Sequence, residues 1–198
     1  MGRWWTMCGV ALSAVGLAAC GGGGGESEAT ARGPVSANAG TVDVSTVQLP
    51  VGLGCDNPDF AAALLNAINE ARTQGRQCGG QPYAAVHALP WNTLLAQSAA
   101  GHASDMAAQD YFSHTGSDGS HSADRIRATG YRIRFHAEIL AHPQGSHSAP
   151  SQVIPQSMAS WLASPDHCRI VMSPSPAELG AACVRKGSKA WLAVNFGS

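Results

Sequence analysis

Two apolar segments near the C-terminus constrain the fold more than any other feature of the sequence. The segments "ELGAACV" (178–184) and "KAWLAVNF" (189–196) are joined by only four residues, "RKGS". Such a short, glycine-containing connection between two apolar segments predicts an antiparallel β-hairpin. The fold therefore contains a sheet, and the rest of the chain has to provide the layers that cover it.

Most of the sequence before this hairpin has the periodicity of helices. From Asp59 onward, apolar residues recur every three or four positions, and residues that start or stop helices lie near the expected ends. Asn92 can cap the second helix. His102 lies on the apolar stripe of that helix, and we interpret it as a core histidine rather than a ligand. The expected helices cover residues 59–75, 92–109 and 122–128, and a segment near Pro155 that ends before Ser164-Pro165.

One further segment, "YRIRFHAEILA" (131–141), alternates between apolar and polar residues and predicts a strand. One face would carry Ile133, Phe135, Ala137 and Ile139, and the other Arg132, Arg134, His136 and Glu138. Helices and strands are largely segregated along the chain, which favours an α+β fold with helices over a small antiparallel sheet. With 198 residues, of which 44% are hydrophobic, the chain suits one globular domain.

The first twenty residues have the composition of an export signal. A basic start with Arg3 precedes an apolar run, from about Val10 to Ala19, that is too short for a stable membrane span. The ending "LAAC" resembles a bacterial lipobox, in which residues 1–19 are removed and Cys20 receives a lipid. An ordinary cleaved signal is the alternative.

Residues 20–54 form a Gly/Ser/Ala/Thr-rich segment with little periodicity apart from "TVDVSTV" (41–47). This composition predicts a flexible tether between the lipid and a domain at residues 55–198. Gly21, rather than an acidic residue, follows Cys20. The resemblance to bacterial lipoproteins therefore implies anchoring in the outer membrane of the cell envelope.

The cysteines support an exported domain. Cys8 leaves with the signal and Cys20 carries the lipid, so that Cys55, Cys78, Cys168 and Cys183 remain. An even number in an exported domain predicts two disulfides. Of the three pairings, sequence proximity favours Cys55–Cys78 with Cys168–Cys183. A zinc cluster is the weaker alternative, because no Cys-x-x-Cys motif or close Cys/His pair repeats.

The common catalytic signatures are absent from the sequence. It contains no His-Glu-x-x-His, no Gly-x-Ser-x-Gly, no phosphate-binding Gly-Lys-Ser/Thr loop and no dinucleotide-binding motif. A catalytic triad assembled from distant residues would leave no such trace. The net charge of −1 gives no sign of a basic surface, so we expect no nucleic-acid partner.

Three polar residues at expected element ends are candidates for a site. His114 follows the second helix in "DYFSHTGSDGS", Glu138 lies on the polar face of the strand, and His167 follows a helix end in "SPDHC". Two histidines brought together can bind a divalent cation, with a nearby carboxylate as a ligand or as an orienting group. Alternatively, the three residues only cap and solvate their elements. Of the other histidines, His121, His142 and His147 are expected to be solvated and His87 to be structural.

Six segments occur in an order and at a spacing that resemble a known family. They are "LLNAINEAR", "LPWNTLLAQSAAGHASDMAAQDYFSHTGSDG", "DRIRATGY", "AEILA", "WLASPDHCRIVM" and "ELGAACV…AWLAVNFG". Together they are similar to the bacterial branch of the CAP superfamily, the relatives of cysteine-rich secretory, antigen 5 and pathogenesis-related proteins. The resemblance spans about residues 59–197. It implies an α-β-α sandwich with a central cleft, into which His114, Glu138 and His167 converge.

The resemblance also implies roles for these residues. His114 and His167 would form a metal-binding pair for Zn²⁺ or another divalent cation, and Glu138 would orient a histidine or a bound water. Three positions depart from the family pattern: Ile139 stands in place of Asn, Ser164 in place of a second acid, and Asp166 in place of Gly. Ser164 and Asp166 are therefore further cleft candidates, with His136 from the face of Glu138. The missing acids weaken the expectation of hydrolysis and of tight metal binding.

The sequence thus predicts an exported, lipid-anchored CAP-domain protein that acts as a binding module. Because several branches of the family bind small apolar or extended ligands, the resemblance implies a lipid-like or peptide ligand in a metal-capable cleft. The alternative is a metal-assisted hydrolase of peptide or cell-wall bonds, with Glu138 as the candidate catalytic base. A Ser-His pair that uses Ser113 or Ser164 is also conceivable. The absence of a recognisable nucleophile–base pair favours the binding module.

Overall fold

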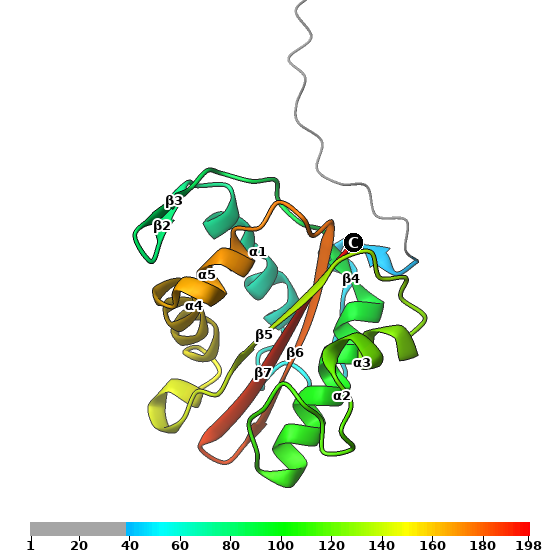
Figure 1. Cartoon of the computed structure of the whole chain (residues 1–198). Helices are drawn as coiled ribbons and strands as arrows, with labels where there is room; N and C mark the ends of the chain where they lie inside the picture. Colours follow the sequence, from blue (N-terminus) through cyan, green and yellow to red (C-terminus); the bar gives the residue numbers. More distant parts are fainter. Residues whose placement is uncertain (1–38) are drawn as a thin grey trace, which may run out of the picture. The chain divides into compact units, whose positions relative to one another are not determined.

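The computed structural model describes residues 39–198, which belong to one compact unit (Figure 1). Its helices are α1 (Phe60–Arg72), α2 (Thr93–Gln109), α3 (Ser122–Ala128), α4 (Val153–Ala163) and α5 (Pro165–Val171), with the 3-10 helices η1 (Val44–Thr46) and η2 (Gly145–Ser148). The expected signal, the lipobox with Cys20 and most of the tether lie outside the described residues. Within residues 39–198, no helix has the length and apolar character needed to cross a membrane.

The main sheet has the strand order β1-β4-β6-β7-β5, and β2 and β3 form a separate small pair. The strands are β1 (Thr41–Val42), β2 (Arg76–Cys78), β3 (Gln81–Tyr83), β4 (Trp91–Asn92), β5 (His136–Ala141), β6 (Glu178–Lys186) and β7 (Lys189–Gly197). Antiparallel pairing of β6 with β7 confirms the predicted hairpin, whose turn is the two residues Gly187-Ser188. The sheet is mixed rather than purely antiparallel, because β4 pairs parallel with β6. β5 forms one end of the sheet and β1 the other.

Helices cover both faces of this sheet, as Figure 1 shows, and the α+β sandwich is confirmed. Alternate residues of β7 divide between the two layers. Leu192 and Val194 pack with residues of α1, α4 and α5, whereas Trp191 and Ala193 pack with residues of α2. α2 approaches β6 so closely at Gly180 that a Cβ there would lie 2.2 Å from the Ala96 amide nitrogen. Only glycine allows this approach.

The predicted strand at 131–141 is a strand only from His136 to Ala141. Its partner β7 ends at Gly197, and both the Arg134 and the Phe135 amides donate to the carbonyl of the last residue, Ser198. The ladder between β5 and β7 thus starts at the pair His136↔Gly197. The α3 helix covers the predicted residues, and α2 begins after the Asn92 cap, whose side chain accepts hydrogen bonds from two amides of the first turn.

The position of His167 differs from the prediction. The sequence predicts a loop after a helix end at this position, but His167 lies on α5, a separate helix that begins at Pro165. Ser164 has an extended backbone and separates α4 from α5. Proline is favoured in the first turn of a helix, so the Ser164-Pro165 pair starts one helix as well as ending another.

The disulfide pairing favoured by sequence proximity is wrong. The disulfides are Cys55–Cys183 and Cys78–Cys168, across 128 and 90 residues of sequence. The physical reason is that α1, about 20 Å long at 1.5 Å per residue, separates Cys55 from Cys78. Instead, the chain at Cys55 runs alongside β6: the Cys55 amide donates to the Cys183 carbonyl at 2.9 Å.

Residues 39–54, which we expected to form the end of the tether, pack on the domain. β1 pairs with β4 through Thr41↔Asn92 and Val42↔Trp91. Further along, Gly54 forms a parallel bridge with Cys183, and the Cys183 amide donates to the Leu53 carbonyl at 2.9 Å. The folded part of the chain thus begins before residue 55.

Candidate functional site

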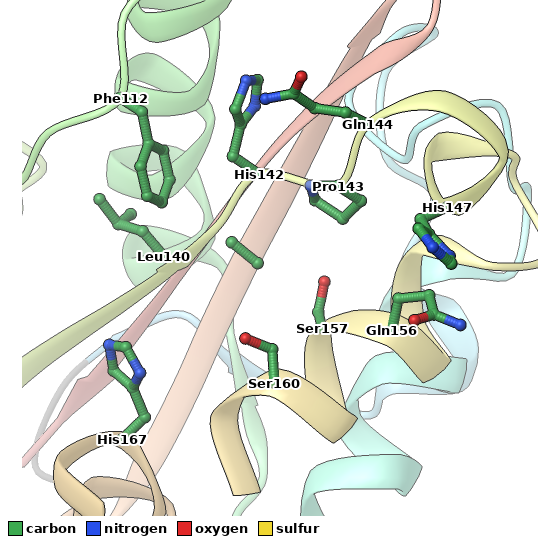
Figure 2. Close-up of a pocket in the computed structure, with 11 residues that line it drawn as sticks. Phe112, Leu140, His142, Pro143, Gln144, His147, Gln156, Ser157, Ser160 and His167 are labelled. Carbon is green, nitrogen blue, oxygen red and sulfur yellow. The ribbon is translucent and has the colours of Figure 1, made fainter. Parts of the chain in front are cut away.

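A cleft of about 520 Å³ lies along the C-terminal half of β5, the end strand of the sheet (Figure 2). Its walls come from the loop after α2, from the segment between β5 and η2, and from α4 and α5. The lining residues are Phe112, Leu140, Ala141, His142, Pro143, Gln144, His147, Gln156, Ser157, Ser160 and His167. This volume falls in the range of ligand pockets in proteins.

One wall of the cleft is built from stacked rings. Phe112, which is 49% exposed, stacks on His142 with the ring centroids 5.5 Å apart, and His142 lies 4.6 Å from the Trp191 ring. His142 Nδ1 lies 2.8 Å from the Ala190 carbonyl, and Trp191 Nε1 donates to the Tyr111 carbonyl at 2.8 Å. Because hydrogen bonds hold the rings of His142 and Trp191 beneath it, the ring of Phe112 presents a fixed apolar surface. The expectation that His142 is solvated is wrong, since its ring lies between two aromatic rings.

The opposite wall carries uncharged polar groups. Figure 2 shows Ser157 and Ser160 pointing from α4 toward the cleft, with His167 on α5 beside them. The Ser157 hydroxyl and His167 Nδ1 are buried and have no hydrogen-bond partner within the described chain. Buried polar groups rarely remain unpaired, so these two atoms mark places where a ligand can bond. The lining contains no Asp, Glu, Lys or Arg.

The loop that carries His114 begins where α2 ends. Asp110 closes the helix in the left-handed conformation, with φ of 53°, and turns the chain back. Asp105 on α2 then holds the loop: the Ser117 hydroxyl and amide donate to its carboxylate at 2.5 and 2.9 Å, and the Tyr111 hydroxyl donates as well. Burial alone would raise the pKa of Asp105, but these hydrogen bonds outweigh it and lower the pKa.

His114 and Glu138 are in direct contact. His114 Nδ1 lies 2.8 Å from Oε1 of Glu138, and Nη2 of Arg125 donates to Oε2 at 2.9 Å. The Glu138 side chain is only 2% exposed, whereas that of His114 is 59% exposed. Arg125 also donates to the carbonyls of His114 and Ser120, at 3.1 and 2.8 Å. One guanidinium from α3 therefore joins the loop to β5.

These contacts determine the charge of Glu138. Burial alone would raise its pKa, but the hydrogen bond from His114 and the charge and hydrogen bond of Arg125 outweigh burial, so the pKa is lowered from 4.5. A general base works best with a pKa near the working pH. Glu138, with a low pKa and both oxygens engaged, is poorly suited to that role. Because Nδ1 of His114 faces the carboxylate, Nε2 remains available to a ligand.

His102 and His167 have pKa values below the ordinary value of histidine. His102 is fully buried, as predicted for a core histidine; its Nε2 lies 2.8 Å from the Ser113 carbonyl. Burial is the main reason that its pKa is lowered. The pKa of His167 is lowered first by burial and then by the charge of His114. His114 follows α2 and His167 lies on α5, so the two residues come from opposite helical layers.

Of the residues predicted to converge in the cleft, His167 alone lines it; His114, Glu138, Ser164, Asp166 and His136 do not. Asp166 is exposed on α5 and pairs with Arg169 at 3.2 Å. Ser164 joins α4 to α5, and its carbonyl accepts a hydrogen bond from the Cys168 amide at 2.9 Å. His136 is half-buried at the start of β5. Asp166, which stands in place of the Gly of the family pattern, therefore brings no carboxylate into the cleft.

Sequence reasoning missed several residues of the site. Arg125 is one of several arginines between 125 and 134, and nothing in its spacing separates it from the others. Phe112 stands in the quoted segment "DYFSHTGSDGS", but its exposure depends on how the loop turns after α2. Ser157 and Ser160 lie in a segment whose helical period was recognised, and polar residues on a helix usually face water. His147 was expected to be solvated; it is exposed, yet it lines the cleft.

The residues fit a zinc ion poorly. Zinc sites in proteins usually have three or four protein ligands. Residues 39–198 bring together no group of three His, Cys, Asp or Glu side chains that could hold a metal. Glu138 is already bound by Arg125, which leaves two imidazoles. The metal-binding pair of His114 and His167 stays a prediction, and we derive no chemical step through a metal.

The comparison with protein families gives one match. The model of the cysteine-rich secretory protein family (CAP) matches residues 65–196. No curated protein matches the chain.

Solved structures share the fold. An outer surface protein from Borrelia burgdorferi has a TM-score of 0.55 and 20% identity, over 69% of this chain and 90% of that chain. NaASP2 with Zn²⁺ has a TM-score of 0.55 and 13% identity, over 76% and 84%. A cysteine-rich secretory protein from Staphylococcus aureus has a TM-score of 0.53 and 18% identity, over 75% and 40%. At these identities the likeness shows the fold alone.

Proposed function

Because the chain belongs to the cysteine-rich secretory protein (CAP) family, we propose that it is an exported, lipid-anchored binding module whose cleft takes an extended peptide. Proteins of this family are typically extracellular or secreted. The signal, the lipobox at Cys20 and the glycines after it support an anchor in the bacterial cell envelope, at the outer membrane. The cleft along β5 supports the ligand class.

The observation that carries the peptide proposal is the uncharged lining of the cleft. Its amides, hydroxyls and imidazoles both donate and accept hydrogen bonds, which suits the alternating N–H and C=O groups of a peptide. The unpaired Ser157 hydroxyl and His167 Nδ1 are two buried positions for such bonds. The exposed ring of Phe112 offers an apolar contact for a side chain. A lipid-like ligand would leave most of these polar groups without partners.

Hydrolysis has less support from the geometry. Both oxygens of Glu138 are engaged, its pKa is lowered, and the cleft residues include no carboxylate. A divalent ion, where it binds, would be held by the imidazoles of His114 and His167. Because the peptide contacts proposed for the cleft involve no metal, we expect peptide binding to persist after treatment with EDTA.

A selection experiment tests the proposal. The full chain with Cys20→Ser, which cannot be lipidated, is immobilised and used to select binders from a library of random-sequence peptides. Selected peptides are then titrated against Ser160→Trp, which places a large ring in the cleft. The matched control is Ala159→Trp, because Ala159 is exposed on the same helix but does not line the cleft.

We expect the selected peptides to keep their affinity for Ala159→Trp and to lose more than about tenfold with Ser160→Trp, a cost above about 1.4 kcal/mol. Equal affinity for the two variants would place binding elsewhere and refute the proposal. Turnover of the peptides that is abolished by Glu138→Gln would favour the hydrolase instead.

A further inference from the structure

A second cavity lies at the opposite end of the sheet from the cleft. It has a volume of about 270 Å³ and lies between the start of α2 and the segment 47–53, which we call the strap. The strap contributes Val47, Gln48, Leu49, Pro50 and Leu53, and the other lining residues are Trp91, Thr93, Ala96, Gln97 and Ala100. Trp91 belongs to β4, next to the end strand β1, whereas the cleft follows the other end strand, β5.

The strap is fixed at both ends. Before it, β1 pairs with β4. After it, the Leu53 carbonyl accepts from the Cys183 amide, and the next cysteine along the chain, Cys55, forms a disulfide with Cys183. Within it, the Leu53 amide donates to the Pro50 carbonyl at 3.0 Å and closes a turn. The strap precedes residues 65–196, the segment that matches the family, so this cavity is formed partly by sequence outside the match.

The surface around this cavity carries no charge in either of its two segments. Residues 44–55 and 93–104 contain no Asp, Glu, Lys or Arg. Val51, at the tip of the strap, is fully exposed, and it is one of only two large apolar residues that are exposed among residues 39–198. The other is Phe112, in the cleft. A single exposed apolar residue is common on protein surfaces, but Val51 stands beside an uncharged, apolar cavity, and the two together form an apolar surface of the kind that contacts lipid or another apolar partner.

The path of the chain favours lipid as the partner of this apolar surface. The Gly40 carbonyl accepts a hydrogen bond of 2.8 Å from the amide of Thr93, a residue of the cavity wall. The segment that leads to Cys20 therefore joins the domain beside this cavity. Gly40 lies twenty positions after Cys20, a stretch that spans at most about 70 Å. A lipid at Cys20 would hold this face near the bilayer at a high effective concentration, so a weak contact suffices.

We propose that this face rests on the bilayer, with Val51 in the interface and the end of a lipid acyl chain in the cavity. The inference rests on the lipid anchor of the proposed function. It places the peptide cleft, at the other end of the sheet, away from the membrane surface and open to the periplasm or the exterior. Because the two segments contain no Lys or Arg, the contact requires no anionic lipid.

Quenching of tryptophan fluorescence by brominated lipids tests the contact. The lipidated full chain is reconstituted in phosphatidylcholine vesicles, and Val51→Trp is compared with Phe112→Trp, which reports from the other end of the sheet. The three tryptophans of residues 39–198, Trp91, Trp161 and Trp191, are at most 1% exposed, and Trp91 lines the cavity, so their own quenching is measured in the wild-type protein and subtracted. We expect the added tryptophan to lose most of its emission at position 51 and little at position 112. Equal quenching at both positions, or none at 51, would overturn the inference.

A pair of cavity variants tests the acyl chain. In the Val51→Trp protein, Ala100→Phe fills the cavity, and Ala108→Phe places the same ring on an exposed part of α2 outside it. Quenching of the tryptophan at position 51 should fall when Ala100→Phe is added but not when Ala108→Phe is added. Unchanged quenching with Ala100→Phe would overturn the acyl-chain assignment. The mass of the N-terminal peptide and sedimentation with vesicles report the anchor separately. Protein that is lipidated and vesicle-bound but not quenched refutes this inference alone, whereas a missing lipid mass refutes the anchor and the inference together.

Discussion

At the scale of single residues, Glu138 is a buried carboxylate with two partners; it lies on β5, the strand that the cleft follows, but does not line the cleft. Glu138 accepts from His114 on one oxygen and from Arg125 on the other, and these bonds keep it ionised although its side chain is almost fully buried. A buried charge is tolerated when it is paired and hydrogen-bonded. Arg125 thus maintains both the charge of Glu138 and, through the His114 carbonyl, the position of the loop.

Replacing Arg125 should expose this dependence. Arg125→Met removes one of the two partners of Glu138 and leaves His114. Because the buried carboxylate is then incompletely paired, we expect the free energy of unfolding at neutral pH to fall by about 3 kcal/mol. The double change Arg125→Met with Glu138→Gln removes the unpaired charge and should recover part of the loss. Urea denaturation measures both values. Equal losses in the single and double variants would show that Arg125 acts through packing alone.

His102 makes the stability of the fold depend on pH. Its Nε2 faces a carbonyl and therefore carries the proton, and its buried Nδ1 has no partner in the described structure. Burial lowers its pKa from 6.5, so below that pH the unfolded chain takes up a proton before the folded chain does. The free energy of unfolding should be highest above pH 6.5 and should decline as the pH falls through the folded pKa.

The variant His102→Gln, whose amide can still donate to the Ser113 carbonyl, should flatten this decline. His167, whose pKa is also lowered, contributes in the same direction, so some dependence will remain. Denaturation curves at a series of pH values below 6.5 provide the test. A decline in His102→Gln as steep as in the wild type would assign the effect to other groups.

At the scale of elements, two disulfides connect parts of the chain that are distant in sequence. Cys55–Cys183 attaches the chain just after the strap to β6, and Cys78–Cys168 attaches the β2–β3 pair to α5. Arg72 adds a third connection. Its buried guanidinium donates to the Val171 and Ser173 carbonyls at the end of α5, and burial lowers its pKa to about 10. α5, which carries His167 into the cleft, is thus held from two sides.

The long loops that these disulfides close predict a large effect of removing them. In the chain-entropy model, a loop of this length contributes about 4 to 5 kcal/mol, against about 3 kcal/mol for a loop of about fifteen residues. Cys78→Ser with Cys168→Ser should therefore lower the free energy of unfolding by about 4 kcal/mol. Denaturation of the oxidised protein measures this loss, and mass spectrometry of linked peptides checks the pairing. Recovery of a Cys55–Cys78 peptide would contradict the structure.

At the scale of the whole molecule, local sequence patterns predicted more of the fold than of the site. The hairpin, the helix capped by Asn92 and the helix at 122–128 follow from short-range signals. The length of β5 depends on where β7 ends, and the disulfides depend on which elements lie side by side. Neither can be derived from spacing. His114 contacts Glu138, but neither residue lines the cleft that His167 lines, and Arg125 and Ser157 acquire their roles only through packing.

The two ends of the sheet have different chemistry. The β5 end carries a cleft with uncharged polar groups and an exposed ring, and the other end, at β1 and β4, carries the apolar cavity beside the strap. In our account the first binds a peptide and the second faces the membrane. This arrangement would keep the binding site accessible in an anchored protein.

The central claim, that the cleft binds a peptide, is tested most directly by mapping where a selected peptide binds. Backbone amide shifts are recorded by NMR for the full chain with Cys20→Ser, with and without the peptide. We predict that the largest changes fall in 140–144 and 156–160, the two segments that face each other across the cleft. Changes confined to the strap, or spread evenly over the domain, would contradict the claim.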